Sequence, residues 1–274
     1  MGTIGIDKHH ARNAKGSFFI FMIILLIGMS MVLYEYSQTS SYKWREDYIS
    51  ILNIFMLAVM FLIVSIIERS RAKKMEQIQT KVKLHELLDQ RRFVVRKEMG
   101  MLTQITYFAM DGNVMGMLKE RYGSPVQKLW KMLVSFFIKG WNSQQFVLYD
   151  GGQNELLNIK KQAGLNLCYK FYNENEEYIG CFKQTWEIKK IEWLSLSSIN
   201  EEIGRITGDL SANIQTGKWR DGSYIDVKED AIPLDAVEYF SASGGSLVNL
   251  VVMEECKEKR AMYYAIAAIL TFQK

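Results

Sequence analysis

Two long apolar stretches lie close together near the beginning of the sequence. Residues 16–34 contain no charged side chain, and residues 48–67 contain none either. Each approaches the ~20 apolar residues that a helix needs to cross ~30 Å of hydrocarbon. The pattern predicts a transmembrane hairpin of two helices over residues 17–67, preceded by a tail of residues 1–16.

Helical periodicity continues beyond the second apolar stretch. Apolar residues recur with a spacing of about 3.5 between Met75 and Leu88, and neither Gly nor Pro interrupts residues 68–91. We therefore expect a basic helical stalk over residues 68–91 that prolongs the second span. The stripe is too short to specify a coiled coil, so it leaves the oligomeric state open.

After the stalk, the pattern changes to short strand-like runs separated by turn residues. Three turns lie between β-rich runs, at 111–113 (Asp-Gly-Asn), 150–152 (Asp-Gly-Gly) and 173–175 (Asn-Glu-Asn). Such turns indicate β-hairpins. The return strands share a terminal lysine, and two share a glycine at matching places: Lys119, Lys160, Lys183, Gly116 and Gly180. Further strand-like runs are WEIKKIEWLSL, RITGDLSANI and SYIDV.

Two helical segments interrupt the β pattern. Residues 125–139 combine lysines with a broad apolar face. This helix either packs on the sheet or lies at a membrane surface, a position that would suit Trp130 and Trp141. Residues 261–272 are apolar all round, too short to span a bilayer but suited to a fully buried helix. A sheet closed around this second helix accounts for its apolar, alanine-rich surface.

The fold class we predict is α+β, mainly β: a closed antiparallel β-barrel over residues 92–274 around a buried C-terminal helix. A transmembrane helical hairpin and a helical stalk precede the barrel. Residues 93–274 resemble the superfamily of tubby C-terminal, phospholipid scramblase and LURP-one-related proteins. The resemblance rests on the hairpins YFAMDGNVMGMLKE, FVLYDGGQNELLNIKK and YKFYNENEEYIGCFKQ and on the terminal helix KRAMYYAIAAIL.

The resemblance to these tubby-like proteins implies a barrel around a central helix, with membrane or phosphoinositide binding and scaffolding rather than an enzymatic core. The basic pocket of tubby proteins has no residue-by-residue match here. The calcium-binding stretch and acylated cysteine cluster of scramblases have no clear equivalent either, so the resemblance does not extend to lipid scrambling.

Positive charge is concentrated beside the second span. The whole chain has a formal charge of +4, yet residues 68–97 alone contain ten basic and four acidic residues. Basic residues also precede the first span, whereas the loop 35–47 has only two against three acidic ones. Because Lys and Arg are retained on the cytoplasmic side, we expect two spans in a plasma membrane, with both termini cytoplasmic. The composition suggests a bacterial source.

Anionic lipid headgroups are the partner that this basic segment indicates. The candidate lipid-binding residues are Arg69, Arg71, Lys73, Lys74, Lys81, Lys83, Arg91 and Arg92. A topology signal followed by a solvated helix face is the alternative explanation of the same charges. Nucleic acid is not an expected partner, because the domain that follows is not basic.

Catalytic and metal-binding motifs are missing from the sequence. The three histidines, His9, His10 and His85, precede the barrel, and no nucleophile-base motif or phosphate loop occurs. Four acidic residues near SYIDV form either a cation site or, as we expect, a solvated turn: Asp221, Asp226, Glu229 and Asp230. We therefore predict no enzyme activity and no cofactor.

Three cysteines, Cys168, Cys181 and Cys256, form no CxxC pair. In a cytoplasmic domain we expect them to be reduced core residues, with a disulfide or metal site as the alternative. The overall prediction is a non-enzymatic, membrane-tethered cytoplasmic barrel that binds anionic headgroups or acts as a membrane-proximal sensor or scaffold. The alternative is an interaction protein, for example an accessory or immunity subunit that binds another membrane or secretion-system protein.

Overall fold

The structure is a computed structural model, and it describes residues 6–37, 44–78, 86–97, 103–121, 143–162, 167–187, 190–209, 214–229, 236, 240 and 245–272. The chain forms two compact units, one over residues 4–81 and the other over residues 82–274. The first contains two long helices and the second contains the β-sheet. Each unit is described by itself.

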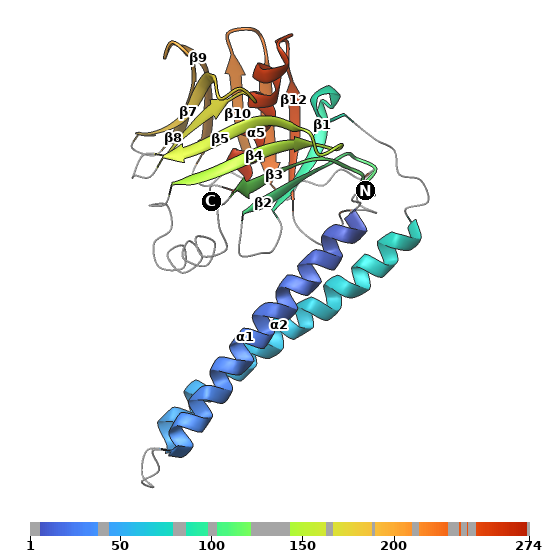
Figure 1. Cartoon of the computed structure of the whole chain (residues 1–274), viewed down its shortest axis with the longest axis vertical. Helices are drawn as coiled ribbons and strands as arrows, with labels where there is room; N and C mark the ends of the chain where they lie inside the picture. The colour runs from blue at the N-terminus through green and yellow to red at the C-terminus, as the bar shows by residue number, and fades with distance from the viewer. Residues whose placement is uncertain are drawn as a thin grey trace. The chain divides into compact units, whose positions relative to one another are not determined.

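The first unit is a helical hairpin of α1 (Ile6–Ser37) and α2 (Trp44–Ile78), drawn in blue to cyan in Figure 1. Both helices are long and apolar enough to cross a membrane, over residues 10–34 and 51–73. Large aliphatic side chains cover their outer surfaces, and Leu33, Met60 and Ile66 are each 60% or more exposed. A surface of this kind suits lipid better than water.

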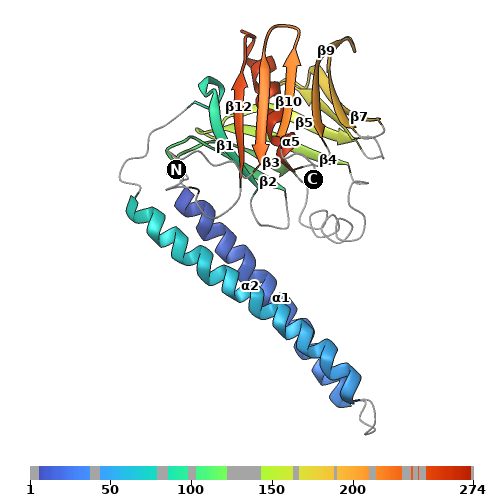
Figure 2. The same cartoon turned by 180° about the vertical axis from the view of Figure 1, so that it is seen from behind.

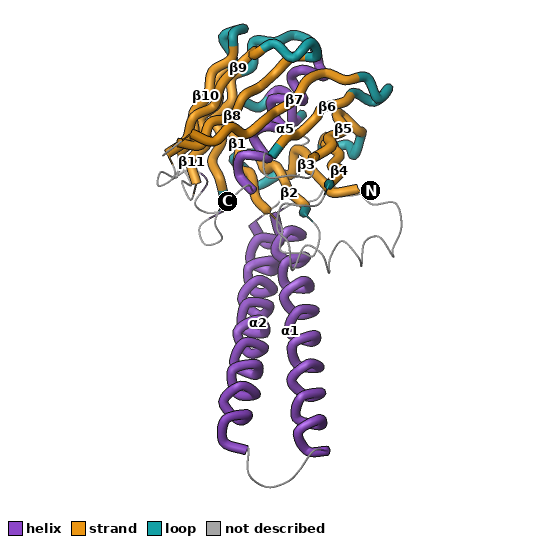
Figure 3. Tube along the Cα trace, turned by 90° about the vertical axis from the view of Figure 1, so that its left-hand side faces the viewer, coloured by secondary structure: helices purple, strands orange, loops and turns teal. Residues whose placement is uncertain are grey.

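Small residues line the contact between α1 and α2, which run side by side in Figure 3. Ala14 and Ala58 are buried there. A Cβ atom at Gly28 would lie 3.2 Å from Ile54 Cγ2, so this glycine marks a close approach of the two helices. Close backbone approach at small residues is the usual way in which membrane helices pack.

The second unit is a closed barrel of twelve antiparallel strands among the described residues (Figures 1 and 2). Each strand pairs with its neighbours in the chain, and pairing of β1 with β12 closes the barrel. The strands are β1 (Arg92–Lys97), β2 (Gln104–Phe108), β3 (Val114–Arg121), β4 (Gln144–Asp150), β5 (Glu155–Gln162), β6 (Cys168–Tyr172), β7 (Tyr178–Glu187), β8 (Lys190–Ser197), β9 (Glu202–Asp209), β10 (Ile214–Trp219), β11 (Tyr224–Glu229) and β12 (Ser246–Val251). The predicted fold class is confirmed.

The three predicted hairpin turns are confirmed, and each is held by its first polar side chain. Asp111 Oδ1 accepts a hydrogen bond from the Asn113 amide, and Asp150 Oδ1 accepts one from the Asn154 amide. Asn173 Oδ1 accepts hydrogen bonds from the Asn175 and Glu177 amides in the turn between β6 and β7. Such side-chain bonds replace backbone pairs in the turn, which is why Asp and Asn initiate it.

Two predicted strand-like runs are each divided between two strands, which we did not foresee. WEIKKIEWLSL is divided between β7 and β8, and RITGDLSANI is divided between β9 and β10. Glu187 pairs with Lys190 across the first of these connections. The two residues between them, Ile188 and Lys189, carry no turn signal, so the pattern reads as one continuous strand.

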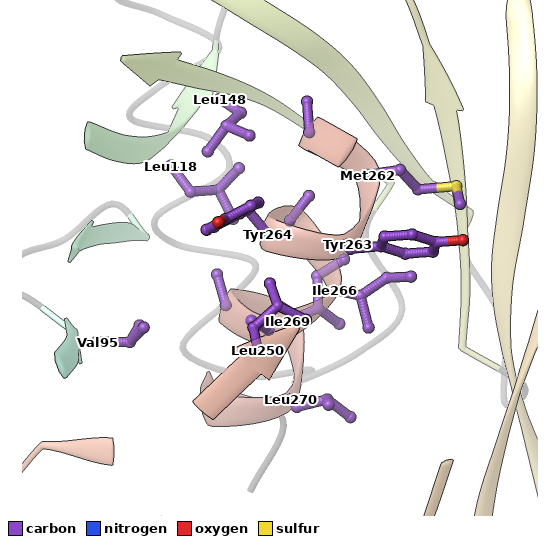
Figure 4. Close-up of a cluster of buried hydrophobic side chains, with 14 of the residues drawn as sticks. Val95, Leu118, Leu148, Leu250, Met262, Tyr263, Tyr264, Ile266, Ile269 and Leu270 are labelled. Carbon is purple, nitrogen blue, oxygen red and sulfur yellow. The ribbon is translucent and has the colours of Figure 1, made fainter. Parts of the chain in front are cut away.

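Helix α5 (Lys257–Phe272) fills the barrel. Residues 261–270 are at most 3% exposed, which confirms the predicted buried helix. In Figure 4, Tyr264 points towards Leu118 on β3, whereas Tyr263 points to the opposite side of the helix. Tyr264 stacks on Phe93 with ring centroids 5.4 Å apart, and the Tyr263 and Trp219 centroids are 4.5 Å apart. These aromatic pairs join α5 to the wall on two sides.

The matching glycines of the first and third hairpins leave space for side chains that pack inside the barrel. A Cβ at Gly116 would lie 2.9 Å from Leu87 Cδ2 and 2.6 Å from the Tyr149 carbonyl oxygen. A Cβ at Gly180 would lie 2.4 Å from the Leu196 carbonyl oxygen and 3.5 Å from Met262 Sδ on α5. Glycine is therefore required sterically at both places.

The predicted stalk is helical only in its first part. Helix α2 continues to Ile78, but Glu86 and Gln90 have extended backbone on either side of the short 3-10 helix η1 (Leu87–Asp89). Leu87 is 1% exposed and belongs to the barrel core. The helix does not reach Arg91, because barrel packing fixes this segment instead. The helix predicted over residues 125–139 lies outside the described residues.

Candidate functional site

A basic groove lies between α1 and α2 at the end of the hairpin that holds the start of α1 and the end of α2. Its volume is about 430 Å³. Three basic side chains line it together with small and aromatic residues: Ala11, Ala14, Lys15, Phe18, Ser65, Arg69, Ala72 and Lys73. The basic groove has no acidic residue among these lining residues.

Helical spacing brings these side chains to one face of the hairpin. The residues from α1 follow one another at i, i+3, i+4 and i+7, and those from α2 at i, i+4, i+7 and i+8. The alanines leave the space between the helices open, and Phe18 forms an apolar wall one turn deeper than Lys15. None of Lys15, Arg69 and Lys73 forms an ion pair or a side-chain hydrogen bond with another described residue. Their positive charges are therefore available to a ligand.

Buried polar groups fix the two helices beside this groove. His10 Nδ1 lies 2.7 Å from Glu68 Oε2, and both side chains are almost fully buried. Arg71 Nη1 donates to the other carboxylate oxygen, Oε1, at 2.8 Å. The Ser65 hydroxyl donates to the Ala14 carbonyl oxygen at 2.9 Å. The His10–Glu68 and Ser65–Ala14 contacts join the two helices and fix their register, which holds the groove residues in place.

The structure separates the eight predicted lipid-binding residues into groups. Arg69 and Lys73 line the basic groove, whereas Arg71 is paired with Glu68 and is not among the lining residues. Lys74 lies on α2, and its side chain is not among those described. Lys81 and Lys83 lie outside the described residues.

Arg91 and Arg92 belong to the barrel unit. Both are exposed, and the Arg91 carbonyl oxygen accepts a hydrogen bond from the Leu250 amide where β1 joins β12. Their backbone therefore closes the barrel, while their side chains remain on its surface.

Lys15 and Phe18 are groove residues that the sequence analysis missed. Lys15 is one of the basic residues before the first span, which the sequence pattern marks only as a topology signal. The available signal was the antiparallel hairpin itself, because contacts such as His10–Glu68 and Ala14–Ser65 follow from a short loop between two antiparallel helices. That register was not worked out from the sequence.

The acidic group near β11 does not form one site. Asp221 accepts hydrogen bonds from Ser223 and from the Tyr263 hydroxyl at the end of the barrel. Asp226 lies 3.3 Å from Lys228 Nζ within the strand, and Asp230 lies outside the described residues. No cluster of three His, Cys, Asp or Glu side chains suited to a metal occurs in the described part of the chain.

A smaller hollow of about 190 Å³ lies on the outer wall of β3 to β6. Arg121 and Lys160 line it together with Glu176, so its charges are mixed. Lys160 Nζ also lies 4.6 Å from the centroid of the Tyr172 ring. Because a carboxylate shares the hollow and an aromatic face lies against Lys160, the hollow is a weaker anion site than the basic groove.

Searches among protein families, curated proteins and solved structures found no match to this chain.

Proposed function

We propose that this protein is a membrane-anchored, non-enzymatic β-barrel module that binds an anionic lipid headgroup in the basic groove of its hairpin. The observation that carries the proposal is the set of three cations, Lys15, Arg69 and Lys73, which pair with no other described residue and surround an open groove with an apolar wall at Phe18. Basic pockets between membrane helices at the cytoplasmic side are typical sites for anionic headgroups.

The charge asymmetry of the sequence supports an orientation in which the groove faces the inner leaflet. The groove belongs to the end of the hairpin that carries the excess of Lys and Arg, which stays cytoplasmic during insertion. The anionic lipids of a plasma membrane are then within reach. Each basic residue near such a surface contributes about 1 kcal/mol.

The barrel contributes an outer surface rather than a cavity. Helix α5 fills the interior, and residues 261–270 are buried there, so the described residues of the barrel leave no lumen open to a ligand. A filled barrel favours the role of a sensor or scaffold. The predicted resemblance to tubby-like proteins, which rests on the hairpin pattern and the enclosed helix, agrees with that role.

The test is a titration of the full-length chain in detergent micelles with phosphatidylglycerol or phosphatidylcholine of equal acyl chains, followed by native mass spectrometry. We expect phosphatidylglycerol to be retained preferentially and its retention to fall as salt rises. The variant with Lys15→Gln, Arg69→Gln and Lys73→Gln removes three contributions of about 1 kcal/mol, so affinity should fall on the order of 100-fold.

The matched control removes the same charge from exposed strand residues of the barrel, with Lys97→Gln, Lys119→Gln and Lys218→Gln. This control should bind phosphatidylglycerol like the unaltered chain. Equal binding of both lipids, or equal losses in the two triple variants, would contradict a headgroup site in the groove. A stoichiometric protein partner that remains bound without lipid preference would favour the interaction-protein alternative.

A further inference from the structure

Two cysteines and two lysines form an array on the outer wall of the barrel, unconnected with the basic groove. Cys168 and Lys170 lie on β6, and Cys181 and Lys183 lie on β7. In the strand register Cys168 pairs with Lys183, and Lys170 pairs with Cys181. Each cysteine therefore faces a lysine directly and the other cysteine diagonally.

The array faces outwards. The intervening residues Tyr169 and Phe182 are fully buried in the core, so the alternation of the strands turns the cysteines to the other face. Cys168 is half-buried, and Cys181 is 5% exposed. The expectation that the cysteines are core residues is therefore wrong for Cys168, and also for the exposed Cys256.

The two thiols influence one another and differ in character. Mutual hydrogen bonding with Cys168, then Tyr178 and the charges of Lys170 and Lys183, lowers the pKa of the Cys181 thiol to about 6 against the opposing effect of burial. The same interaction raises the pKa of Cys168. Cys181 is therefore the thiol of the pair that loses its proton more readily.

We propose that Cys168 and Cys181 are an oxidisable pair that a peroxide converts to a disulfide. In the first step, the Cys181 thiolate attacks the peroxide, an S–O bond forms and the O–O bond breaks. The leaving hydroxide or alkoxide takes up a proton, the peroxide is reduced by two electrons and Cys181 becomes a sulfenic acid. Hydrogen peroxide is small enough for a thiol as enclosed as Cys181.

In the second step, the sulfur of Cys168 attacks the sulfur of Cys181. The S–S bond forms, the S–O bond breaks, and the departing hydroxide leaves as water with the proton of Cys168. Diagonal neighbours in a sheet are about 7–8 Å apart at Cα, slightly beyond the usual span of a disulfide. Cys168 is the first residue of β6, and a disulfide requires this end of the strand to shift against the hydrogen bond from the Gln184 amide to the Leu167 carbonyl oxygen.

The experiment treats the full-length chain in detergent micelles with hydrogen peroxide, blocks remaining thiols by alkylation and maps the products by mass spectrometry. We expect a cross-linked peptide pair containing Cys168 and Cys181, with the loss of two hydrogens, which a reducing agent restores. In Cys168→Ser the sulfenic acid at Cys181 should persist and react with dimedone. In Cys256→Ser the cross-link should form as before.

The effect of the neighbouring lysines on the oxidation rate of Cys181 distinguishes a reactive pair from two cysteines that are merely close together. Lys170→Gln with Lys183→Gln should slow oxidation of Cys181 severalfold at pH 7, whereas Lys119→Gln with Lys218→Gln should leave the rate unchanged. Three results would overturn the proposal: oxidation of Cys256 ahead of the pair, a sulfenic acid at Cys181 that persists while Cys168 stays reduced, or equal rates in both lysine variants.

Discussion

The Tyr264 hydroxyl donates a hydrogen bond to the carbonyl oxygen of Leu88, 176 residues earlier in the chain, at 2.9 Å. The same hydroxyl lies 2.7 Å from the Gln90 carbonyl oxygen. Arg260 Nη2 also donates to the Leu88 carbonyl. Helix α5 thus binds the segment that leads into β1. Its side chains satisfy carbonyl oxygens that would accept backbone hydrogen bonds if the predicted stalk helix continued through this segment.

Replacing Tyr264 by Phe should destabilise the barrel by about 1–3 kcal/mol, because carbonyl oxygens at Leu88 and Gln90 lose a donor in a largely buried place. Thermal unfolding of the full chain in micelles, followed by near-ultraviolet circular dichroism, measures the effect. Tyr224→Phe is the control, since Tyr224 is 43% exposed. Equal melting temperatures for the two variants would show that the contact adds nothing to stability.

Ala267→Asp should unfold the barrel. Ala267 is 0% exposed in the middle of α5, so the substitution buries a carboxylate without a partner, at a cost of several kcal/mol. The exposed Lys257→Asp at the start of the same helix should change stability by no more than about 0.5 kcal/mol. A folded Ala267→Asp variant with an unaltered melting temperature would be incompatible with an enclosed helix.

Gly180→Ala should cost about 1–3 kcal/mol, because its Cβ would lie 2.4 Å from the Leu196 carbonyl oxygen and the backbone would have to move. Gly152→Ala is the matched substitution in an exposed turn, where the nearest atom is the movable Asn154 Nδ2 at 3.1 Å. We expect a clear fall in melting temperature for the first variant alone. Similar falls in both would argue against close packing at Gly180.

Stability should decline above about pH 10. Burial raises the pKa of Tyr107, Tyr169, Tyr263 and Tyr264 above the ordinary value of a tyrosine. The folded state therefore keeps protons that the unfolded state releases, and stability falls as pH rises through the unfolded pKa. Each such tyrosine contributes a slope of up to about 1.4 kcal/mol per pH unit. Denaturant unfolding at several alkaline pH values measures how the free energy of unfolding changes with pH. Tyr169→Phe should make this pH dependence less steep, and an unchanged pH dependence would refute the account.

A single cysteine introduced at Ser40 should react with a membrane-impermeant maleimide added to intact cells, whereas one at Ile199 should not. Ser40 belongs to the loop predicted outside, and Ile199 is a 72% exposed turn residue of the barrel. The background variant has all three native cysteines replaced by Ser. Permeabilised cells supply the positive control for Ile199, and labelling of Ile199 before permeabilisation would reverse the proposed orientation.

Local patterns predicted the barrel well. The turns at Asp111, Asp150 and Asn173 and the apolar stretch of α5 carry their signals in a few neighbouring residues, so the hairpins and the enclosed helix follow from the sequence. The connection after Glu187 has no such signal. Leu87 shows helical periodicity, but packing in the barrel core decides its conformation.

The candidate sites depend on contacts between distant residues, and there the sequence says less. Arg69 and Lys73 were selected for their charge alone, whereas Lys15 becomes their neighbour only through the register of α1 on α2. Arg71 was selected by the same criterion and is paired with Glu68. The array of Cys168 and Cys181 likewise exists only once β6 and β7 are aligned.

The enclosure of α5 has a consequence for how the chain is made. The helix follows every described strand in chain order, and the barrel closes through pairs such as Phe93–Val248. During synthesis, the early strands are able to form hairpins locally, but their inner faces stay uncovered until the last segment arrives. Long-range closure of this kind makes folding slow. The growing chain therefore exposes an apolar wall for most of the synthesis of the barrel, and chaperones that cover this wall would protect it from aggregation until the final helix is in place.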